Sequence, residues 1–514
     1  MIARIQSWQQ SLTAFFHPRV MTMLFFGIAA GIPLLLIFSS LSLWLREANI
    51  ERDTVTYFSW AALGYSFKFV WAPLIDVIPL PWLTRWLGRR RAWLLLSQLM
   101  IMLAIGLMAM IDPASQGLAF MALAAVLLGF SAATQDVVID AYRIESAGEE
   151  LQAMMSASYI AGYRIGMLLA GAGALFLASY FGSSMGHYQF EAWQKAYWLM
   201  ALSMLVGVIT TCIIKEPVVA QQRVSRAARD YVGLFVVFLL AVTAMVGCFL
   251  LTSEWAGRAK AVLSDVLYNP YIGAVLVELL RFAVGLGVAV VLTRLCLRWN
   301  WVDRQLARQS YIEPIQDFFQ RYGWSMAWLL LALVGLYRIS DIVLGAIANV
   351  FYQDMGFSKP QIATVVKSFG LAMTIAGGFI GGVLAMRIGV MKTLFLGALL
   401  SAITNLLFML LAGMGDNITM LYVVISADNL SAGIASAAFV AFLSSLTNIS
   451  FTAVQYAIFS SLMTLLPKMM GGYSGSMVQA MGYEWFFLIT ALLGLPVLLL
   501  IAVAAKRFQL KREA

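Results

Sequence analysis

Two aspartates, Asp136 and Asp140, lie four residues apart in an otherwise apolar stretch of the chain, and residues 117–134 before them carry no charge. In a helix, residues four apart lie on one face, so both carboxylates would point the same way. A charged group at the centre of a bilayer costs about 3 kcal/mol on insertion scales. The pair is therefore expected to bind a proton or to line a path for a polar solute. The alternative is an ion pair with Arg143 or Arg164 that locks a helix end, and it stays open for both aspartates.

Arg164 follows Tyr163 in the next apolar stretch. A guanidinium can bind a carboxylate or a pyrophosphate-like group through two parallel hydrogen bonds. Its alternative role is to neutralise Asp136. The two roles can alternate if a substrate anion replaces the internal partner.

Other charged residues are candidates for a gate. Asp76 ends an apolar stretch, and Arg89 and Arg90 follow in the polar segment after it. A charge relay between Asp76 and these arginines is expected to latch one conformational state. The alternative is that the arginines only orient the chain in the membrane. Arg338 and Asp341 are three apart on one predicted helix, where a local ion pair is the simpler interpretation.

The second half of the chain holds further polar candidates for a binding site. Lys367 is isolated in an apolar stretch and is expected to face a central cavity. Asp428 and Asn429 begin a polar helix face, and an amide offers the donors and acceptor that sugar hydroxyls require. Gln455 adds hydrogen-bonding capacity in a later stretch. Small polar residues also allow close helix approach, which is the competing interpretation.

These residues belong to a chain of 514 residues that is 62% hydrophobic and 11% charged, with mean hydropathy +0.85. Soluble proteins carry about 25% charged residues, so the composition indicates a polytopic all-α membrane protein. The net charge of +9 is then information on orientation and does not indicate nucleic-acid binding. The three cysteines and two histidines are scattered, so neither metal nor cofactor is expected.

A membrane span requires about 20 apolar residues. On that basis about fourteen spans are predicted: 21–45, 54–77, 92–111, 117–142, 152–181, 193–214, 231–252, 271–297, 323–352, 359–386, 392–413, 418–447, 450–480 and 484–505. Lys and Arg concentrate in alternate polar segments, among them 85–91, 215–229, 298–321 and 506–512. The intervening segments carry only Arg46, Arg52, Lys195, Arg258, Lys260 and Lys359. This bias places both termini in the cytoplasm.

The predicted spans divide into an N-terminal six-helix bundle (1–214), a middle segment (215–322) and a C-terminal six-helix bundle (323–514). The middle segment holds two inserted helices, 231–252 and 271–297, and then a cytoplasmic amphipathic stretch. Its Ile312, Ile315, Phe318 and Phe319 recur at helical spacing, as on a helix that lies on the membrane surface. A solvated tether is the alternative. The second span of each six-helix bundle ends in a similar sequence. Two repeats of six helices are typical of the major facilitator fold.

Several strings resemble the AmpG-type muropeptide permeases of Gram-negative bacteria. They cover both sixes and read YSFKFVWAPLID (65–76), GRRRAWLL (88–95), SAATQDVVIDA (131–141), GYRIGML (162–168), DNL (428–430), SAAFVA (436–441) and AVQYA (453–457). The resemblance implies a proton-coupled importer in the bacterial inner membrane. Its cargo would be N-acetylglucosamine-anhydro-N-acetylmuramic acid, with or without peptide, and its roles would be peptidoglycan recycling, beta-lactamase induction and antibiotic resistance.

A solute of this kind is large, polar and anionic, and Gln135, Arg164, Lys367 and Asn429 are expected to hold it, with Tyr163, Asp428 and Gln455 beside them. Protons, the lipid bilayer and the muropeptide are the expected partners of a monomer. One alternative is a major facilitator transporter of another amphiphilic anion, such as an acyl-coenzyme A, or of a drug. A membrane-embedded enzyme is a weaker alternative, because no nucleophile, acid or metal cluster stands near a loop.

Overall fold

The computed structural model describes residues 14–50, 58, 64–115, 117–184, 186–217, 228–267, 270–358, 361–471 and 474–513. Apart from one isolated bridge between Ser184 and His187, the regular structure of these residues is helical. Contacts divide the chain into two compact units. The first unit consists of Met1–Ala72, Pro79–Val219 and Phe318–Ala514, and the second of Pro73–Ile78 and Ala220–Asp317.

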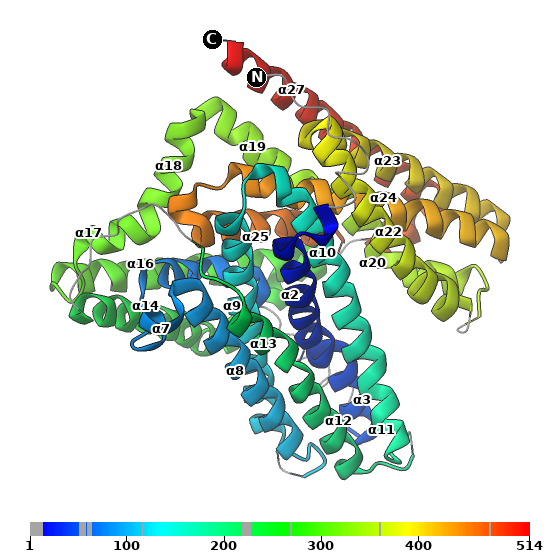
Figure 1. Cartoon of the computed structure of the whole chain (residues 1–514). Coiled ribbons are helices and arrows are strands. Elements are labelled where there is room, and N and C mark those ends of the chain that lie inside the picture. Colours follow the sequence, from blue (N-terminus) through cyan, green and yellow to red (C-terminus); the bar gives the residue numbers. More distant parts are fainter. Residues whose placement is uncertain are drawn as a thin grey trace. The chain divides into compact units, whose positions relative to one another are not determined.

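The N-terminal helices of the first unit run beside one another (Figure 1). They are α2 (Pro18–Leu35), α3 (Leu41–Glu47), α5 (Gly64–Phe67), η4 (Lys68–Val70), α7 (Leu83–Leu87), α8 (Arg89–Met110), α9 (Leu118–Ser146), α10 (Glu149–Leu168), α11 (Ala174–Tyr180), α12 (Phe190–Ser203) and α13 (Leu205–Ile213). Their apolar core includes the stacked rings of Trp44 and Trp193, which are fully buried. We call this set the N-terminal bundle.

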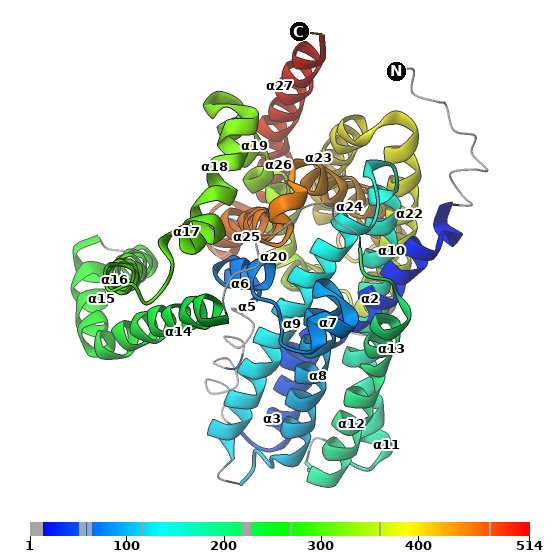
Figure 2. The same ribbon diagram turned by 60° about the vertical axis from the view of Figure 1, so that its left-hand side comes forward.

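The C-terminal helices of the same unit form a second set, which we call the C-terminal bundle (Figure 2). It comprises α19 (Trp324–Leu336), α20 (Ile339–Asp354), η7 (Ile362–Phe369), α22 (Gly370–Ile388), α23 (Val390–Met414), α24 (Ile418–Leu446), α25 (Thr452–Gly471), α26 (Ser474–Leu492) and α27 (Gly494–Glu513). Phe351, Phe408 and Phe487 are buried together in its core.

Glycines allow the closest helix contact in the N-terminal bundle. A Cβ added to Gly162 of α10 would lie 2.0 Å from the carbonyl oxygen of Leu24, and one added to Gly27 of α2 would lie 2.2 Å from that of Tyr159. Only hydrogen fits at such positions, as in small-residue helix contacts within membranes. Together, α2 and α10 therefore form a rigid pair that fixes where the α10 side chains lie.

Eleven helices of the described residues are long and apolar enough to span a membrane, and the count of about fourteen stays a prediction. Residues 54–57 and 59–63 of the predicted span 54–77 lie outside the described residues, and its end at 64–77 is interrupted by the 3-10 turn η4. The last two spans are divided differently from the prediction. The helix α25 ends at Gly471 and the next helix begins at Ser474, whereas one span was predicted over 450–480. The kink at Gly482, with φ +80°, lies in the segment 481–483 between the two predicted spans.

The second unit contains both predicted inserted helices, as α14 (Ala228–Leu251) and α16 (Pro270–Arg298). Between them lies α15 (Ser253–Leu267), which was expected to be a loop. After them come α17 (Arg304–Ala307) and η6 (Arg308–Ile312), and α6 (Ala72–Val77) also belongs mainly to this unit.

The predicted amphipathic stripe is only partly correct. Ile312 and Ile315 are exposed, whereas Phe318 of α18 (Glu313–Tyr322) is 4% exposed. The Phe318 ring packs 5.2 Å from that of Phe459 in α25. Helical spacing identified the apolar residues, but it did not show that one of them belongs to the core of the C-terminal bundle.

Candidate functional site

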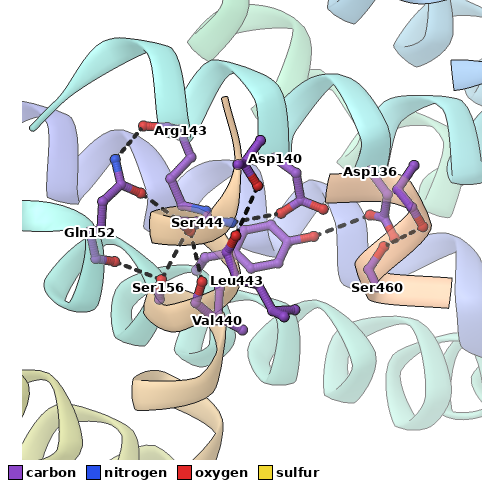
Figure 3. A network of polar contacts seen from close by, with 12 residues as sticks. Asp136, Asp140, Arg143, Gln152, Ser156, Val440, Leu443, Ser444 and Ser460 are labelled. Atoms are coloured by element: carbon purple, nitrogen blue, oxygen red, sulfur yellow. Dashed lines mark hydrogen bonds and ion pairs between the residues drawn. The ribbon is translucent and has the colours of Figure 1, made fainter. Parts of the chain in front are cut away.

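Asp140 is held by two cations, of which Figure 3 shows Arg143. Arg143 Nη2 donates to Asp140 Oδ1 at 3.1 Å, one turn further along α9, and Lys68 Nζ of η4 lies 3.9 Å from Oδ2. Arg143 is fully buried, and Asp140 and Lys68 are 8% and 7% exposed. The ion pair with Arg143 that was predicted as one alternative for Asp140 is therefore present. The i,i+3 spacing on one helix places the two groups within reach.

Arg143 also connects the two bundles. Its Nη1 donates to Ser444 Oγ of α24 at 2.6 Å, and it lies 3.2 Å from Gln152 Oε1 and 3.3 Å from Ser156 Oγ of α10. The guanidinium lies 5.1 Å from the centre of the Tyr456 ring of α25. A buried guanidinium is tolerated only where acceptors and a counter-ion surround it. The sequence had indicated Arg143 only as a possible partner of the aspartates, whereas the structure buries it between the two bundles.

Asp136 lies one turn from Asp140 and is half-buried. Tyr159 of α10 donates a hydrogen bond of 3.1 Å to its Oδ1. Its neighbour Gln135 is fully buried, and neither amide atom has a hydrogen-bond partner within the described part of the chain. The alternative pairing of Asp136 with Arg164 is not the one formed, because Arg164 is exposed and its electrostatic neighbours in the described residues are Arg338 and Tyr163.

A second polar junction joins the bundles through Arg90, Glu145 and Thr452, which are 0%, 8% and 0% exposed. Arg90 Nε donates to Glu145 Oε2 at 2.9 Å, and its Nη2 donates to Thr452 Oγ1 at 2.6 Å. The Thr452 hydroxyl in turn donates to Glu145 Oε1. Arg89 adds a bridge of 3.2 Å to the same carboxylate. Charge-assisted bonds of this kind are stronger than neutral ones.

Helix ends fix the position of these arginines. Gly88 precedes α8 with φ +86°, and Glu216 accepts from the backbone N–H groups of Arg90 at 2.8 Å and Arg91 at 3.1 Å. A carboxylate at a helix N-terminus satisfies free N–H groups and complements the helix dipole. The Arg91 side chain donates to the carbonyls of Thr211 and Cys212 at the end of α13. The arginine run thus organises one end of the bundle.

The bundles also meet through small residues. A Cβ on Gly382 of α22 would lie 3.2 Å from the Cβ of Ala157 and 3.3 Å from the sulfur of Met154, both on α10. The first turns of α10 therefore pack against α22 at the same end of the molecule as Ser156 and Gln152. We call this contact and the two polar clusters the inter-bundle junction.

Arg338 and Asp341 form the expected local ion pair, with Nε 3.3 Å from Oδ2. Each is also bound to another helix: Arg338 Nη1 donates to Ser436 Oγ of α24 at 2.8 Å, and Asp341 accepts from Ser401 of α23 at 2.6 Å. Asp428 accepts from Thr404 at a longer 3.4 Å.

The remaining binding candidates differ in their surroundings. Lys367 is exposed and donates to Asn349 Oδ1 at 2.9 Å. Asn429 accepts from Thr374 at 2.8 Å, which fits the interpretation that it joins α22 to α24. Gln455 is 2% exposed, and its Oε1 accepts from Arg321 and from the backbone of Asn448. As ligands of a substrate, all three stay predictions.

The predicted latch of Asp76 with Arg89 and Arg90 is not tested by these contacts. Asp76 is buried in α6, which belongs to the second unit, so its pairing with Arg89 and Arg90 stays a prediction. The residues that sequence reasoning missed are Glu145 and Thr452. The signal for Glu145 was available, because Asp140, Arg143 and Glu145 fall within six residues of one apolar helix. Thr452 gave no such signal. No group of His, Cys, Asp or Glu in the described residues could hold a metal ion.

Solved structures show which fold this is. The fucose transporter FucP in the outward conformation aligns with TM-score 0.62 at 11% identity, over 96% of this chain and 99% of that one. The human organic anion transporter MFSD10 aligns with TM-score 0.55 at 14% identity, over 94% and 99%. The chain therefore has the fold of the major facilitator superfamily transporters, here with buried charged residues between two helical bundles.

Proteins similar in sequence add to this comparison. The chain is 29% identical to putative transporter AmpG 4 of Rickettsia conorii, over 94% of this chain and 95% of that protein. It is 28% identical to the anhydromuropeptide permease of Escherichia coli K12, over 98% and 83%. The family described as acetyl-coenzyme A transporter 1 matches residues 19–216. The resemblance to AmpG-type permeases is therefore confirmed along nearly the whole chain.

Proposed function

We propose that this protein imports peptidoglycan fragments across the bacterial inner membrane, driven by protons. The cargo is N-acetylglucosamine-anhydro-N-acetylmuramic acid, with or without a stem peptide. The observation that carries the proposal is the similarity to an anhydromuropeptide permease over 98% of the chain. The charged residues between the bundles support it, because an anionic sugar needs cations and hydrogen-bonding groups at its site.

The inter-bundle junction supports alternating access. The bias of Lys and Arg places the ends of α8, α9 and α25 that carry the junction on the cytoplasmic side. In this proposal, the protein with the junction formed is closed toward the cytoplasm, and its outer halves receive the substrate. Import requires the junction to break as one bundle rocks against the other.

Protons act through the α9 aspartates in this proposal. Asp140 is a counter-ion of Arg143, and Arg143 binds Ser444 of the other bundle. Protonation of Asp140 removes the charge that keeps Arg143 in place, which weakens the junction and favours inward opening. Asp136, one turn away and half-buried, is the group that exchanges the proton with water. The membrane potential adds about 2.3 kcal/mol per charge for each 100 mV.

The substrate site of this proposal is formed by Gln135, Tyr163, Arg164, Lys367, Asp428, Asn429 and Gln455. Gln135 has the clearest claim among the neutral side chains, because its buried amide lacks a described partner. A buried unpaired amide costs about 1–3 kcal/mol, and a sugar hydroxyl or an amide of the cargo would recover that cost.

The test is uptake of labelled anhydromuropeptide into proteoliposomes with an imposed proton gradient. The native protein should accumulate the sugar, and a protonophore should abolish accumulation. Asp136→Asn should still exchange substrate across the membrane but no longer accumulate it. Asp112→Asn is the matched control, because Asp112 accepts from Tyr188 in a loop region and should couple normally. Full proton-driven accumulation by Asp136→Asn would dismiss Asp136 as the coupling residue.

A second cargo is favoured by one specific observation. Residues 19–216 match a family described as acetyl-coenzyme A transporter 1. Competition for binding to the purified protein between anhydromuropeptide and acetyl-coenzyme A separates the two. Tighter binding of acetyl-coenzyme A would overturn the muropeptide assignment while it preserves the transporter class.

A further inference from the structure

Arg143 contacts one helix of each bundle, so positions along these two helices can be compared from its level. It contacts Ser156 of α10 at 3.3 Å and Ser444 of α24 at 2.6 Å. Arg164 lies eight residues after Ser156 on α10, and Ser436 lies eight residues before Ser444 on α24. Since a helix rises 1.5 Å per residue, both lie about 12 Å from the level of Arg143. By the predicted orientation, both lie on the outer side of the junction.

Ser436 is the residue that holds Arg338. The Arg338 guanidinium donates to Ser436 Oγ at 2.8 Å, so its charge lies near the level of Arg164. Electrostatic interaction between Arg164 and Arg338 agrees with this geometry. Two arginines, one from each bundle, thus lie at a similar level beyond the junction and interact electrostatically.

The two arginines are not equally neutralised. Arg338 has Asp341 at 3.3 Å. Arg164 is exposed, and its electrostatic neighbours among the described residues, Arg338 and Tyr163, carry no carboxylate. Like charges that approach across two bundles repel, and a shared anion converts this repulsion into attraction. A bidentate carboxylate ligand would leave the hydroxyls of a sugar free for other residues.

We propose that Arg164 and Arg338 form a cross-bundle site for a carboxylate group of the cargo. This inference rests on the proposed import function and adds the chemical group that is recognised. Without an anion the two arginines repel each other, and this repulsion keeps the bundles apart. A bound carboxylate attracts both arginines, so substrate binding favours closure of the outer side. Loading of the site and the conformational change are thereby linked.

The test compares binding of anhydromuropeptide with binding of its carboxylate methyl ester to purified protein. For the native protein, loss of the charge should weaken binding about ten- to hundredfold, as for a hydrogen bond to a charged group. In Arg164→Gln the acid should bind about as weakly as the ester, so the ratio of the two affinities falls toward one. Arg164→Lys should keep part of the ratio, because it retains charge but loses the planar guanidinium.

Controls separate site from fold. Lys195→Gln removes another exposed cation of the N-terminal bundle, at the ring of Phe181, and should preserve the native ratio. Arg338→Gln combined with Asp341→Asn avoids an unpaired carboxylate and should lower the ratio as Arg164→Gln does. If both the Arg164 and the Arg338 variants kept the native ratio of acid to ester affinity, the carboxylate site would be wrong. Uptake by the native protein would then still support the proposed function. Absence of any muropeptide binding to the native protein would instead refute the proposed function.

Discussion

Thr452→Val tests whether the inter-bundle junction controls the conformational equilibrium. The substitution keeps the shape of the side chain but removes the hydroxyl that accepts from Arg90 and donates to Glu145. Arg90 and Glu145 remain paired within the N-terminal bundle, so no isolated charge is created. The loss is therefore that of hydrogen bonds to charged groups, about 1.5–3 kcal/mol. Because these bonds form only while the junction is closed, the open fraction should rise about ten- to hundredfold.

Spin labels on Ser146 of α9 and Ile449, just before α25, report the separation of the bundles beside this cluster. In Thr452→Val the distance distribution should gain a longer component, and Thr452→Ser should restore the native distribution. Thr210→Val is the matched control, because the Thr210 hydroxyl donates only to the Val206 carbonyl of its own helix at 2.6 Å. An unchanged distribution in folded Thr452→Val would refute the role of the junction.

Two further predictions concern stability. Gly162→Leu should lower the melting temperature strongly or prevent folding, because the new side chain meets the Leu24 carbonyl. Gly148→Ala is the control, because open space surrounds Gly148 and the melting temperature should not change. Thermal unfolding followed by size-exclusion chromatography distinguishes the two variants. Glu216→Ala should lower the free energy of unfolding by about 0.5–2 kcal/mol, because the N-terminus of α8 loses its capping carboxylate. An unchanged melting temperature would contradict this role of Glu216.

Prediction from sequence succeeded where the bilayer leaves one solution. An apolar stretch must satisfy its backbone internally, so α9 was expected over 117–142 and is found over Leu118–Ser146. The local ion pairs of Asp140 with Arg143 and of Arg338 with Asp341 were also accessible, because a three-residue spacing places both partners on one face.

Contacts between bundles were not accessible in this way. Arg90 and Thr452 are 362 residues apart, and nothing in either local sequence specifies that α8 and α25 meet. From the sequence, Arg143 was identified only as a possible ion-pair partner of the aspartates. Only the docking of α10 and α24 around it supplies the acceptors that make burial tolerable.

The chemistry of the junction matches reversible opening better than an apolar contact would. Exposing apolar surface costs about 25 cal/mol for each Å², whereas Arg90, Glu145 and Thr452 exchange their mutual hydrogen bonds for bonds to water at a smaller net cost. The small residues Ala157 and Gly382 add contact without deep interlocking. Within the N-terminal bundle the situation is reversed, since the backbones of α2 and α10 touch at glycines that leave no room for water. Rigid pairs inside each bundle and a hydratable contact between bundles are together what a rocking transporter requires.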